Sequence, residues 1–189
     1  MKRGLLIVIS GPSGVGKDTV IKRLLELDPK LKKTVSYTTR PRRKNEVEGV
    51  DYLYVSREDL QARILDGQIL EHAEYDGNLY ATSAAQVDER LTDGYDTILK
   101  IDVQGAEQVR LKFPEARFIF LAPPSMEELF RRQTTRNTES FQDMTARRLI
   151  AQREMAYKSR YDFVVVNDDV EGAAREILGI IRHARERQT

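Results

Sequence analysis

A glycine-rich segment near the amino terminus constrains the fold of this chain more than any other feature. Residues 5–9 form a continuous apolar run, residues 11–17 hold the glycines, and an amphipathic segment follows at about residues 19–27. An uninterrupted apolar run is typical of a strand that is buried on both faces of a parallel sheet. The order strand, glycine loop, helix therefore predicts the first unit of an α/β fold.

The remaining sequence alternates between strand and helix patterns, except for one stretch with more β character. Expected strands lie at residues 34–38, 50–55, 69–75, 79–82, 97–102, 117–121 and 163–166, and expected helices begin near residues 57, 84, 104, 126 and 171. Ser56 and Ser125 are expected N-caps, and Asp76-Gly77-Asn78 is a hairpin signal. A loop at residues 134–143 precedes a further long helix. The pattern predicts a parallel sheet covered by helices on both faces, with residues 34–82 in a small inserted lobe.

Composition restricts the class of protein. The 189 residues suffice for one complete core but are short for two domains, and the net charge of +1 gives no reason to expect a nucleic-acid partner. The absence of cysteine excludes disulfides, zinc–thiolate sites and thiol catalysis, and the two histidines, His72 and His183, lie far apart in sequence. The apolar run at the amino terminus is too short for a signal peptide or a membrane span. We therefore expect a cytoplasmic protein without a membrane partner, either a monomer or a small homo-oligomer.

Four residues lie at or just past the carboxyl ends of the predicted parallel strands. They are Ser10, Asp102, Ala122 and Asn167. Ligands of parallel sheets bind outside the carboxyl ends of the strands. We therefore expect these four residues to line one rim of the sheet.

The glycine-rich segment reads Gly11-Pro12-Ser13-Gly14-Val15-Gly16-Lys17 and matches the phosphate-binding loop pattern. Glycines let the backbone wrap around a phosphate, the following helix adds the positive end of its dipole, and Lys17 adds a point charge. A turn that merely connects strand to helix is the alternative. The position between a buried strand and a helix favours the phosphate loop. The segment, with Asp18 and Thr19, is therefore the predicted ATP site.

Asp18 stands where the loop pattern has Ser or Thr, whose hydroxyl contacts Mg²⁺. Thr19 supplies a hydroxyl one position later. Asp18 could instead hold Mg²⁺ through a water molecule, or simply favour the helix amino terminus as an acidic residue. Mg²⁺ is expected with ATP because it bridges phosphates. Either Asp18 or Thr19 could orient the ion.

A series of segments, all in the right order, resembles guanylate kinase. Beyond the phosphate loop they are Ser36-Tyr37-Thr38-Thr39-Arg40, Gly49-Val50-Asp51-Tyr52, Leu70-Glu71-His72-Ala73, Gly77-Asn78-Leu79-Tyr80, Ile101-Asp102-Val103-Gln104-Gly105, Ala122-Pro123-Pro124-Ser125 and Val165-Val166-Asn167-Asp168-Asp169. The resemblance implies ATP-dependent phosphorylation of GMP or dGMP to GDP by direct in-line transfer, with release of ADP. It also implies one domain with a core at residues 1–33, 91–125 and 157–189, a GMP-binding lobe at 34–90 and a lid at 126–156.

Arginine and tyrosine side chains are suited to hold the acceptor phosphate. Arg40 and Arg43 offer planar donor forks, and Tyr52 and Tyr80 can donate hydroxyl hydrogens to the same oxygens. The resemblance assigns these four residues to the phosphate of GMP. The family usually has proline just before the second arginine, whereas this chain has Arg42, which could take part of the role of Arg43. A solvated charged loop is the alternative.

Glu71, Thr82 and, as a weaker candidate, Ser36 resemble readers of guanine. Guanine offers N1–H and N2–H₂ as donors and O6 as an acceptor, so a carboxylate accepts two hydrogens while a hydroxyl donates one. An exposed or arginine-paired glutamate is the alternative for Glu71. Asp102 ends an apolar strand, where a lone acid is costly unless it is used. The resemblance places Asp102 near the guanine, but Lys100 stands where family members often carry a further acid.

The resemblance also implies a lid with catalytic arginines, because positioned arginines stabilise the charge that develops on a transferred phosphoryl group. The lid arginines are Arg132, Arg136 and Arg147, with Arg131 and Arg148 as neighbours, and the match to the family favours Arg136 and Arg147. A solvent-facing helix that carries arginines is the alternative. The expected catalytic residues are Lys17, Arg43, Arg136 and Arg147. Asn167 and Asp168 resemble adenine-contacting residues, and a strand-ending turn is the alternative for both.

Other functions stay open at this point. A non-catalytic guanylate-kinase-like module would bind protein ligands, but the intact loop lysine and the arginines argue against it. A GTPase switch would use residues 102–105, which fit Asp-x-x-Gly, yet no Asn-Lys-x-Asp motif follows. A kinase for another nucleoside monophosphate would be distinguished by a panel of substrates.

Overall fold

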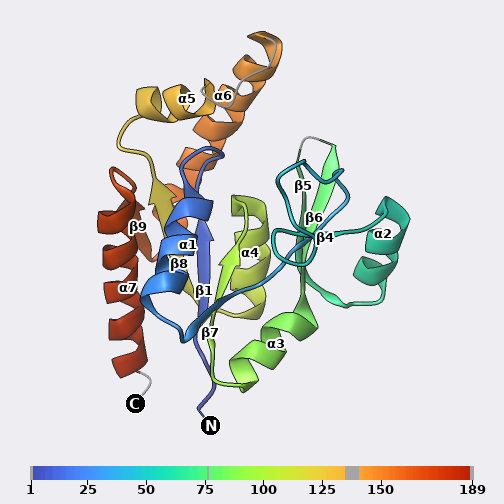
Figure 1. Ribbon diagram of the computed structural model, residues 1–189, viewed down its shortest axis with the longest axis vertical. Coiled ribbons are helices and arrows are strands. Elements are labelled where there is room, and N and C mark those ends of the chain that lie inside the picture. The colour runs from blue at the N-terminus through green and yellow to red at the C-terminus, as the bar shows by residue number, and fades with distance from the viewer. Residues whose placement is uncertain (1, 76, 135–140, 188–189) are drawn as a thin grey trace.

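A five-stranded parallel sheet forms the centre of the molecule (Figure 1). The computed structural model describes residues 2–75, 77–134 and 141–187, with only the backbone described for residues 134 and 141–147. The sheet has the order β2-β7-β1-β8-β9. Its strands are β1 (Leu6–Ser10), β2 (Leu31–Lys33), β7 (Asp96–Lys100), β8 (Arg117–Ala122) and β9 (Phe163–Val166). All four pairings in the sheet are parallel, as the alternation of strands and helices predicts.

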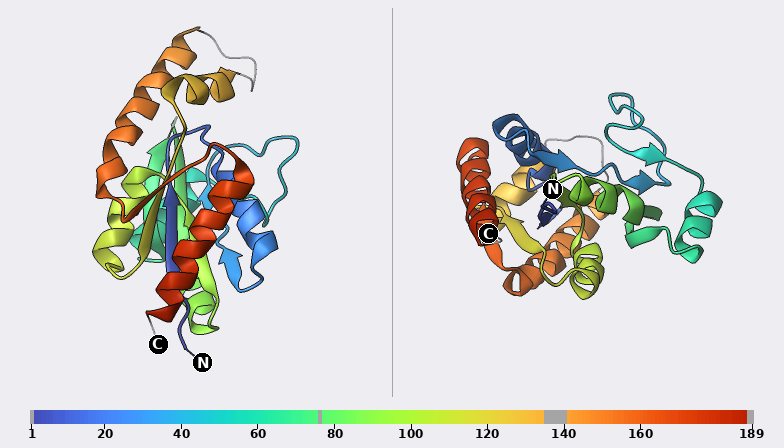
Figure 2. Two further views of the ribbon diagram at one scale, coloured as in Figure 1. Left: turned by 90° about the vertical axis from the view of Figure 1, so that its left-hand side faces the viewer. Right: turned by 90° about the horizontal axis from the view of Figure 1, so that it is seen from below.

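Helices cover both faces of this sheet. The first face carries α1 (Lys17–Leu27) and α7 (Val170–Glu186), which lie side by side in Figure 2 (left). The second face carries α3 (Ala84–Thr92) and α4 (Val103–Lys112). In β1, Ile7 and Ile9 pack toward α1 and α7, whereas Leu6 and Val8 pack toward α3 and α4. The continuous apolar run therefore serves two cores at once, as expected for a strand buried on both faces.

A smaller mixed sheet forms a separate lobe on the right of Figure 1. It contains β3 (Tyr37–Thr38), β4 (Leu53–Tyr54), β5 (Ile69–Tyr75) and β6 (Asn78–Ser83), in the order β4-β3-β6-β5. The β5–β6 pair is the expected antiparallel hairpin, and Gly77 has a φ of 69° at its turn. Helix α2 (Arg57–Leu65) packs Leu60 against this sheet, which gives the lobe a small core of its own.

The helices α5 (Met126–Thr134) and α6 (Phe141–Ala156) lie above the carboxyl edge of the large sheet in Figure 1, and the short 3₁₀ helix η1 (Tyr157–Arg160) follows them. The expected loop at residues 134–143 is too long, because residue 134 ends α5 and residues 141–143 begin α6; residues 135–140 lie outside the described part. None of the described helices is both long enough and apolar enough to cross a bilayer.

Three other expectations about strands need correction. Strand β2 was not expected, because its Leu31-Lys32-Lys33 sequence has a single buried side chain and becomes a strand only by pairing with β7. Strand β3 is shorter than residues 34–38, and β4 is shorter than residues 50–55. Val50 lies in a turn that is closed by its N–H bond to Val47 O, and its side chain is exposed. The expected caps are confirmed, since Ser56 and Ser125 accept hydrogen bonds at the starts of α2 and α5.

Candidate active site

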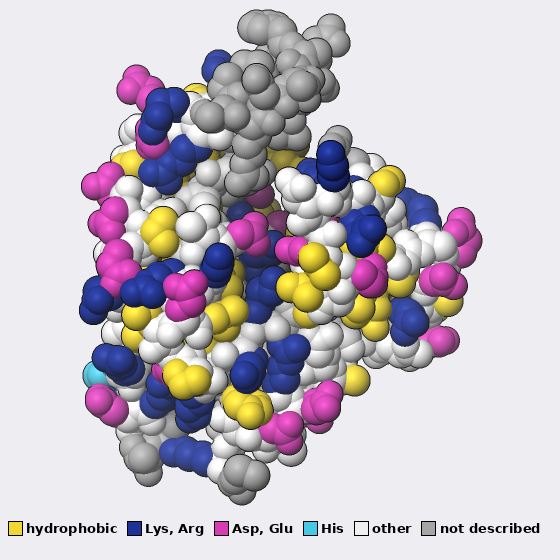
Figure 3. All heavy atoms as spheres, in the orientation of Figure 1, with side chains coloured by type: hydrophobic (Ala, Val, Ile, Leu, Met, Phe, Trp, Pro, Cys, Tyr) yellow, Lys and Arg dark blue, Asp and Glu magenta, His cyan; other side chains and the backbone are white. Residues whose placement is uncertain are grey.

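The carboxyl edge of the large sheet gathers the residues that were expected to line one rim. Ser10 Oγ donates to Ile101 O at 2.9 Å, which ties the end of β1 to the end of β7. Asn167 N donates to Ala122 O at 2.8 Å, which ties the end of β9 to the end of β8. Figure 3 shows a hollow beside this edge, between the core and the lobe, with Lys and Arg side chains along it. The predicted rim is therefore confirmed.

The loop after β1 passes so close to its neighbours that two of its residues must be glycine. Gly11 has a φ of 149°, and a Cβ there would overlap Leu121 O. Gly16 has a φ of 100°, and a Cβ there would overlap the amide nitrogen of Asn167. Both φ values belong to the region that L side chains rarely adopt. The glycines therefore let the backbone wrap tightly between β1 and α1.

Lys17 begins α1 and folds back over this loop. Its Nζ donates to Gly11 O at 2.5 Å and to Pro12 O at 3.2 Å. Burial is the main reason that the pKa of Lys17 is lowered, and Lys100 lowers it further, while the nearby carboxylates of Glu154 and Asp18 act in the opposite direction. A buried ammonium group at a glycine loop is well placed to meet an anion.

Two side chains from α5 and α6 hold Ser13 in the same loop. Gln133 Nε2 donates to Ser13 O at 2.6 Å, and Glu154 Oε2 accepts from Ser13 N at 3.2 Å. Glu154 is 7% exposed, and burial raises the pKa of its carboxyl, although Lys17 lowers it. Sequence reasoning missed both residues, because no local pattern links them to a loop far away in the chain. The backbone N–H of Ser13 therefore already donates to an anionic oxygen, that of the Glu154 carboxylate.

Asn167 binds the backbone of the same loop through its side chain. Its side chain is 3% exposed, and its Nδ2 donates to Val15 O at 2.8 Å. Arg132 Nη1 donates to Asn167 O at 3.1 Å, so α5 also contacts this point. The geometry gives Asn167 a supporting role, and its expected contact with adenine stays a prediction. Asp168 is exposed beside it.

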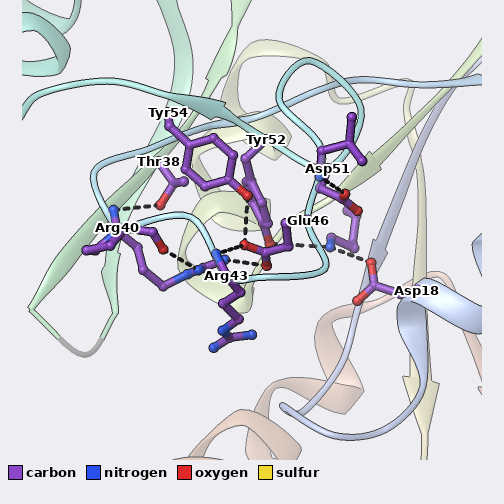
Figure 4. Close-up of polar contacts among 11 residues, drawn as sticks. Asp18, Thr38, Arg40, Arg43, Glu46, Asp51, Tyr52 and Tyr54 are labelled. Atoms are coloured by element: carbon purple, nitrogen blue, oxygen red, sulfur yellow. Dashed lines mark hydrogen bonds and ion pairs between the residues drawn. The ribbon is translucent and has the colours of Figure 1, made fainter.

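Asp18 and Lys100, the two departures noted in the sequence, form one ion pair. Lys100 Nζ lies 2.5 Å from Asp18 Oδ1 and 3.4 Å from Tyr52 Oη. Burial alone would raise the pKa of Asp18, but the Lys100 ammonium holds it below its ordinary value. The pair connects the start of α1 with the end of β7, and Tyr52 connects it with the lobe (Figure 4).

The arginines of the lobe differ in how they are held. Arg40 Nη2 lies 2.7 Å from Glu46 Oε1, and Glu46 also accepts from the backbone N–H of Arg43 and from Tyr54 Oη. Burial would raise the pKa of Glu46, but these donors hold it at about 2. The Arg43 side chain is exposed and points away from this cluster in Figure 4. Arg40 is thus fixed in place before any ligand binds, along with the Tyr52 and Tyr80 rings, whose centroids lie 5.9 Å apart.

Glu71 is buried, which argues against the alternative that it is an ordinary exposed glutamate. Its side chain lies in β5 with 4% exposure, and Thr82 Oγ1 of β6 donates to its Oε1 at 2.5 Å. Burial, with a contribution from Asp102, raises the pKa of Glu71 to about 7, although the Thr82 hydroxyl and Lys112 act to lower it. The hairpin therefore presents a carboxyl group and a hydroxyl as a bonded pair. Ser36 is half-buried in the same lobe.

Asp102 has a structural use, but it does not end a strand as expected for residues 97–102, because β7 ends at Lys100 and Asp102 precedes α4. Its Oδ1 accepts from Gly105 N at 2.8 Å and so caps α4. Burial raises the pKa of this carboxyl, although the cap and Lys17 oppose the shift. Gly105 in turn leaves room for Glu71, because a Cβ at this position would overlap Glu71 Oε2. Asp102 therefore lies between the loop lysine and the buried glutamate.

Two expected catalytic residues cannot be placed. Arg136 lies outside the described residues, and the side chain of Arg147 lies outside them as well. Their neighbour Arg148 is described, with its guanidinium 4.8 Å from the centre of the Phe130 ring.

The residues at the loop suit a metal that arrives with phosphates rather than one held by protein alone. Within the described ranges no three His, Cys, Asp or Glu residues come together to hold a metal. Asp18 offers a hard oxygen donor with its side chain 72% exposed, and Thr19 is exposed next to it. Mg²⁺ commonly binds through one or two such groups plus the phosphates of a substrate. The loop therefore fits Mg²⁺ only in company with ATP.

The close approach of Glu71 to Gly105 predicts that replacing glycine by alanine has opposite effects in α4 and in α7. Alanine stabilises a helix interior by about 1 kcal/mol relative to glycine. Gly179→Ala in α7, where a Cβ meets no atom within 4 Å, should therefore raise the free energy of unfolding by about that amount. Gly105→Ala should lower it, because the displaced Glu71 loses its bond to Thr82, and an unsatisfied buried group costs roughly 1–3 kcal/mol. Urea unfolding measures both variants, and an equal gain in both would contradict this prediction.

Comparisons with known proteins agree on one family. The guanylate kinase family model matches residues 3–184. A guanylate kinase from Oceanobacillus iheyensis is 47% identical over 181 residues, which cover 96% of this chain and 88% of that protein.

Solved structures point the same way. A guanylate kinase from Anaplasma phagocytophilum superposes with a TM-score of 0.81 and 38% identity, covering 97% of this chain and 87% of that one. An uncharacterized protein from Eubacterium ventriosum shares only the fold, with a TM-score of 0.52, 14% identity, and coverage of 96% and 99%. With its phosphate loop, its separate mixed sheet and a family match over nearly its full length, this chain belongs to the guanylate kinase family.

Proposed function

We propose that this guanylate kinase transfers the γ-phosphoryl group of ATP to the phosphate of GMP or dGMP, forming GDP or dGDP and ADP. An oxygen of the acceptor phosphate attacks the γ-phosphorus in line, and the bond to the β-phosphate oxygen of ADP breaks. No protein nucleophile takes part. The work of the protein is to hold two anions in line and to stabilise charge on the transferred group.

The donor side of the proposed site is the loop of residues 11–17. Its backbone N–H groups and Lys17 would bind the β- and γ-phosphates of ATP. The contact of Glu154 Oε2 with Ser13 N at 3.2 Å supports this, because an anionic oxygen already accepts from a loop amide. Asp18 or Thr19 would face Mg²⁺ bound with ATP, and that ion supplies neutralisation of phosphate charge.

The acceptor side is the lobe. Arg40 and Arg43 would bind the GMP phosphate together with Tyr52 and Tyr80. Fixing Arg40 through Glu46 reduces the entropy that is lost on binding, whereas the exposed Arg43 is free to close on the ligand. Arg43, Arg136 and Arg147 remain the proposed arginines at the transferred phosphoryl group.

The observation that carries the substrate assignment is the buried pair of Glu71 and Thr82. An ionised Glu71 can accept from N1–H and N2–H₂ of guanine, and the Thr82 hydroxyl can turn to donate to O6. The ionised form of a carboxyl group with 4% exposure and a pKa of about 7 costs free energy when it has too few hydrogen-bond donors around it. A ligand that supplies two donors would therefore stabilise it. Ser36 and Asp102 would lie beside the base.

A panel of nucleoside monophosphates with ATP and Mg²⁺ tests the proposed function. GMP and dGMP should be converted far faster than AMP, CMP or UMP. Lys17→Ala should lower kcat for GMP at least about 10²-fold, as loss of a positioned charge does. Calorimetry should show that this variant still binds GMP, because Lys17 serves the donor phosphates. Absence of turnover with every monophosphate would favour a non-catalytic module, and a preference for another base would refute the assignment.

The raised pKa of Glu71 predicts that GMP binding weakens in mild acid. The free carboxyl has a pKa of about 7 and must be ionised to accept from guanine, so protonation below that pH competes with binding. Between pH 8 and pH 6 the affinity should fall by about tenfold, since one pH unit below the pKa leaves about a tenth of the group ionised. Calorimetry across this range measures the fall. The GMP phosphate also titrates here, so Glu71→Gln serves as the control, and an equally steep fall in that variant would contradict the prediction.

A further inference from the structure

We propose that Lys100 is a further cation of the acceptor-phosphate site, held in place by Asp18 until the phosphate of GMP takes over. The inference rests on the proposed function, because it needs GMP as the ligand of the lobe. Lys100 lies at the carboxyl end of β7, on the rim between the phosphate loop and the lobe. Lys100 would thus join the arginine and tyrosine side chains that are proposed to bind the same phosphate.

The ammonium group of Lys100 lies beside a tyrosine of the proposed phosphate site. Lys100 Nζ lies 3.4 Å from Tyr52 Oη and 5.3 Å from the centre of the Tyr52 ring. The guanidinium carbon of Arg40 lies 5.5 Å from the centre of the same ring. Two cationic side chains therefore lie close to the Tyr52 ring. A phosphate oxygen that accepts from the Tyr52 hydroxyl on the side of Lys100 can accept from the ammonium group as well.

Three lysine ammonium groups, those of Lys17, Lys33 and Lys100, lie near one another on this rim. Burial lowers the pKa of Lys17 and of Lys33, and the nearby charge of Lys100 lowers both further. The carboxylate that faces Lys100 directly is Asp18. The Lys100 side chain is only 17% exposed, and although burial acts to lower its pKa, Tyr52 and Asp18 raise it, so Lys100 keeps its charge beside two other ammonium groups. Such a setting attracts a polyvalent anion such as phosphate.

Asp18, unlike Lys100, is the exposed member of the ion pair. Its side chain is 72% exposed, so water can solvate the carboxylate when the pair opens, and an ion pair with an exposed partner contributes little to stability. The pair can therefore open at small cost when a better partner arrives, and a phosphate oxygen makes a strong charge-assisted bond to an ammonium group. Asp18 is then released on the donor side. This gives a reason for a carboxylate where the loop pattern has a hydroxyl.

Calorimetry with GMP alone, without ATP and without Mg²⁺, tests the role of Lys100. Lys100→Met should weaken GMP binding by at least about tenfold, because a hydrogen bond to a charged group is worth roughly 1.5–3 kcal/mol. Asp18→Asn should leave GMP affinity unchanged or raise it, because it releases Lys100. Lys32→Met is the matched control: Lys32 also lies over a tyrosine ring, 5.0 Å from the centre of Tyr95, but at the other end of the sheet, and its loss should change nothing.

Guanosine separates a phosphate contact from a structural effect. Lys100→Met should bind guanosine as the wild type does, since guanosine lacks the phosphate. Equal losses for GMP and guanosine, equal losses in Lys100→Met and Asp18→Asn, or unchanged GMP binding in Lys100→Met would each overturn the inference. A wild-type protein that fails to bind GMP would instead refute the proposed function. Circular dichroism checks folding, and Lys100→Gln replaces the methionine variant if that one does not fold.

Discussion

Parallel hydrogen bonding of β1 with both β7 and β8 is the constraint on which the rest of the site depends. Parallel strands end at one edge, so the loop after β1, the cap of α4 and the Asn167 turn must meet there. They meet so closely that Gly11 and Gly16 have no room for a side chain. The lobe reaches this edge through Glu71, which lies against Gly105, and the helices α5 and α6 reach it through Ser13.

Charges that are costly to bury are concentrated at the same edge. Burial raises the pKa of Glu71, Asp102 and Glu154, and it lowers the pKa of Lys17. Groups with such shifts are arranged where a ligand or a reaction will use them. Under the proposed function, the donors of guanine would serve the carboxyl group in the lobe, and phosphate oxygens would serve the ammonium groups on the rim. Binding of both substrates would then offset the cost of burying these groups.

Local patterns explain how much of this could be predicted from the sequence. The apolar run, the glycine loop, the hairpin and the serine caps each depend on neighbouring residues, so β1, β5, β6 and the starts of α2 and α5 were predicted. Strand β2 was missed because only β7 makes it a strand. Glu154 was missed because its contact with Ser13 joins distant parts of the chain. Asp18 and Lys100 were each noticed as departures, but only the fold reveals that they form a pair.

We infer that a buried carboxylate in the lobe selects guanine, and the ratio of kcat/KM for GMP to that for AMP tests this role most directly. AMP presents a lone pair at N1 and lacks the 2-amino group, so it gains nothing from Glu71. Glu71→Ala should lower kcat/KM for GMP by at least about tenfold and change it far less for AMP, so that discrimination narrows. Circular dichroism would confirm that the variant is folded. A folded variant with an unchanged ratio of GMP to AMP would contradict the account.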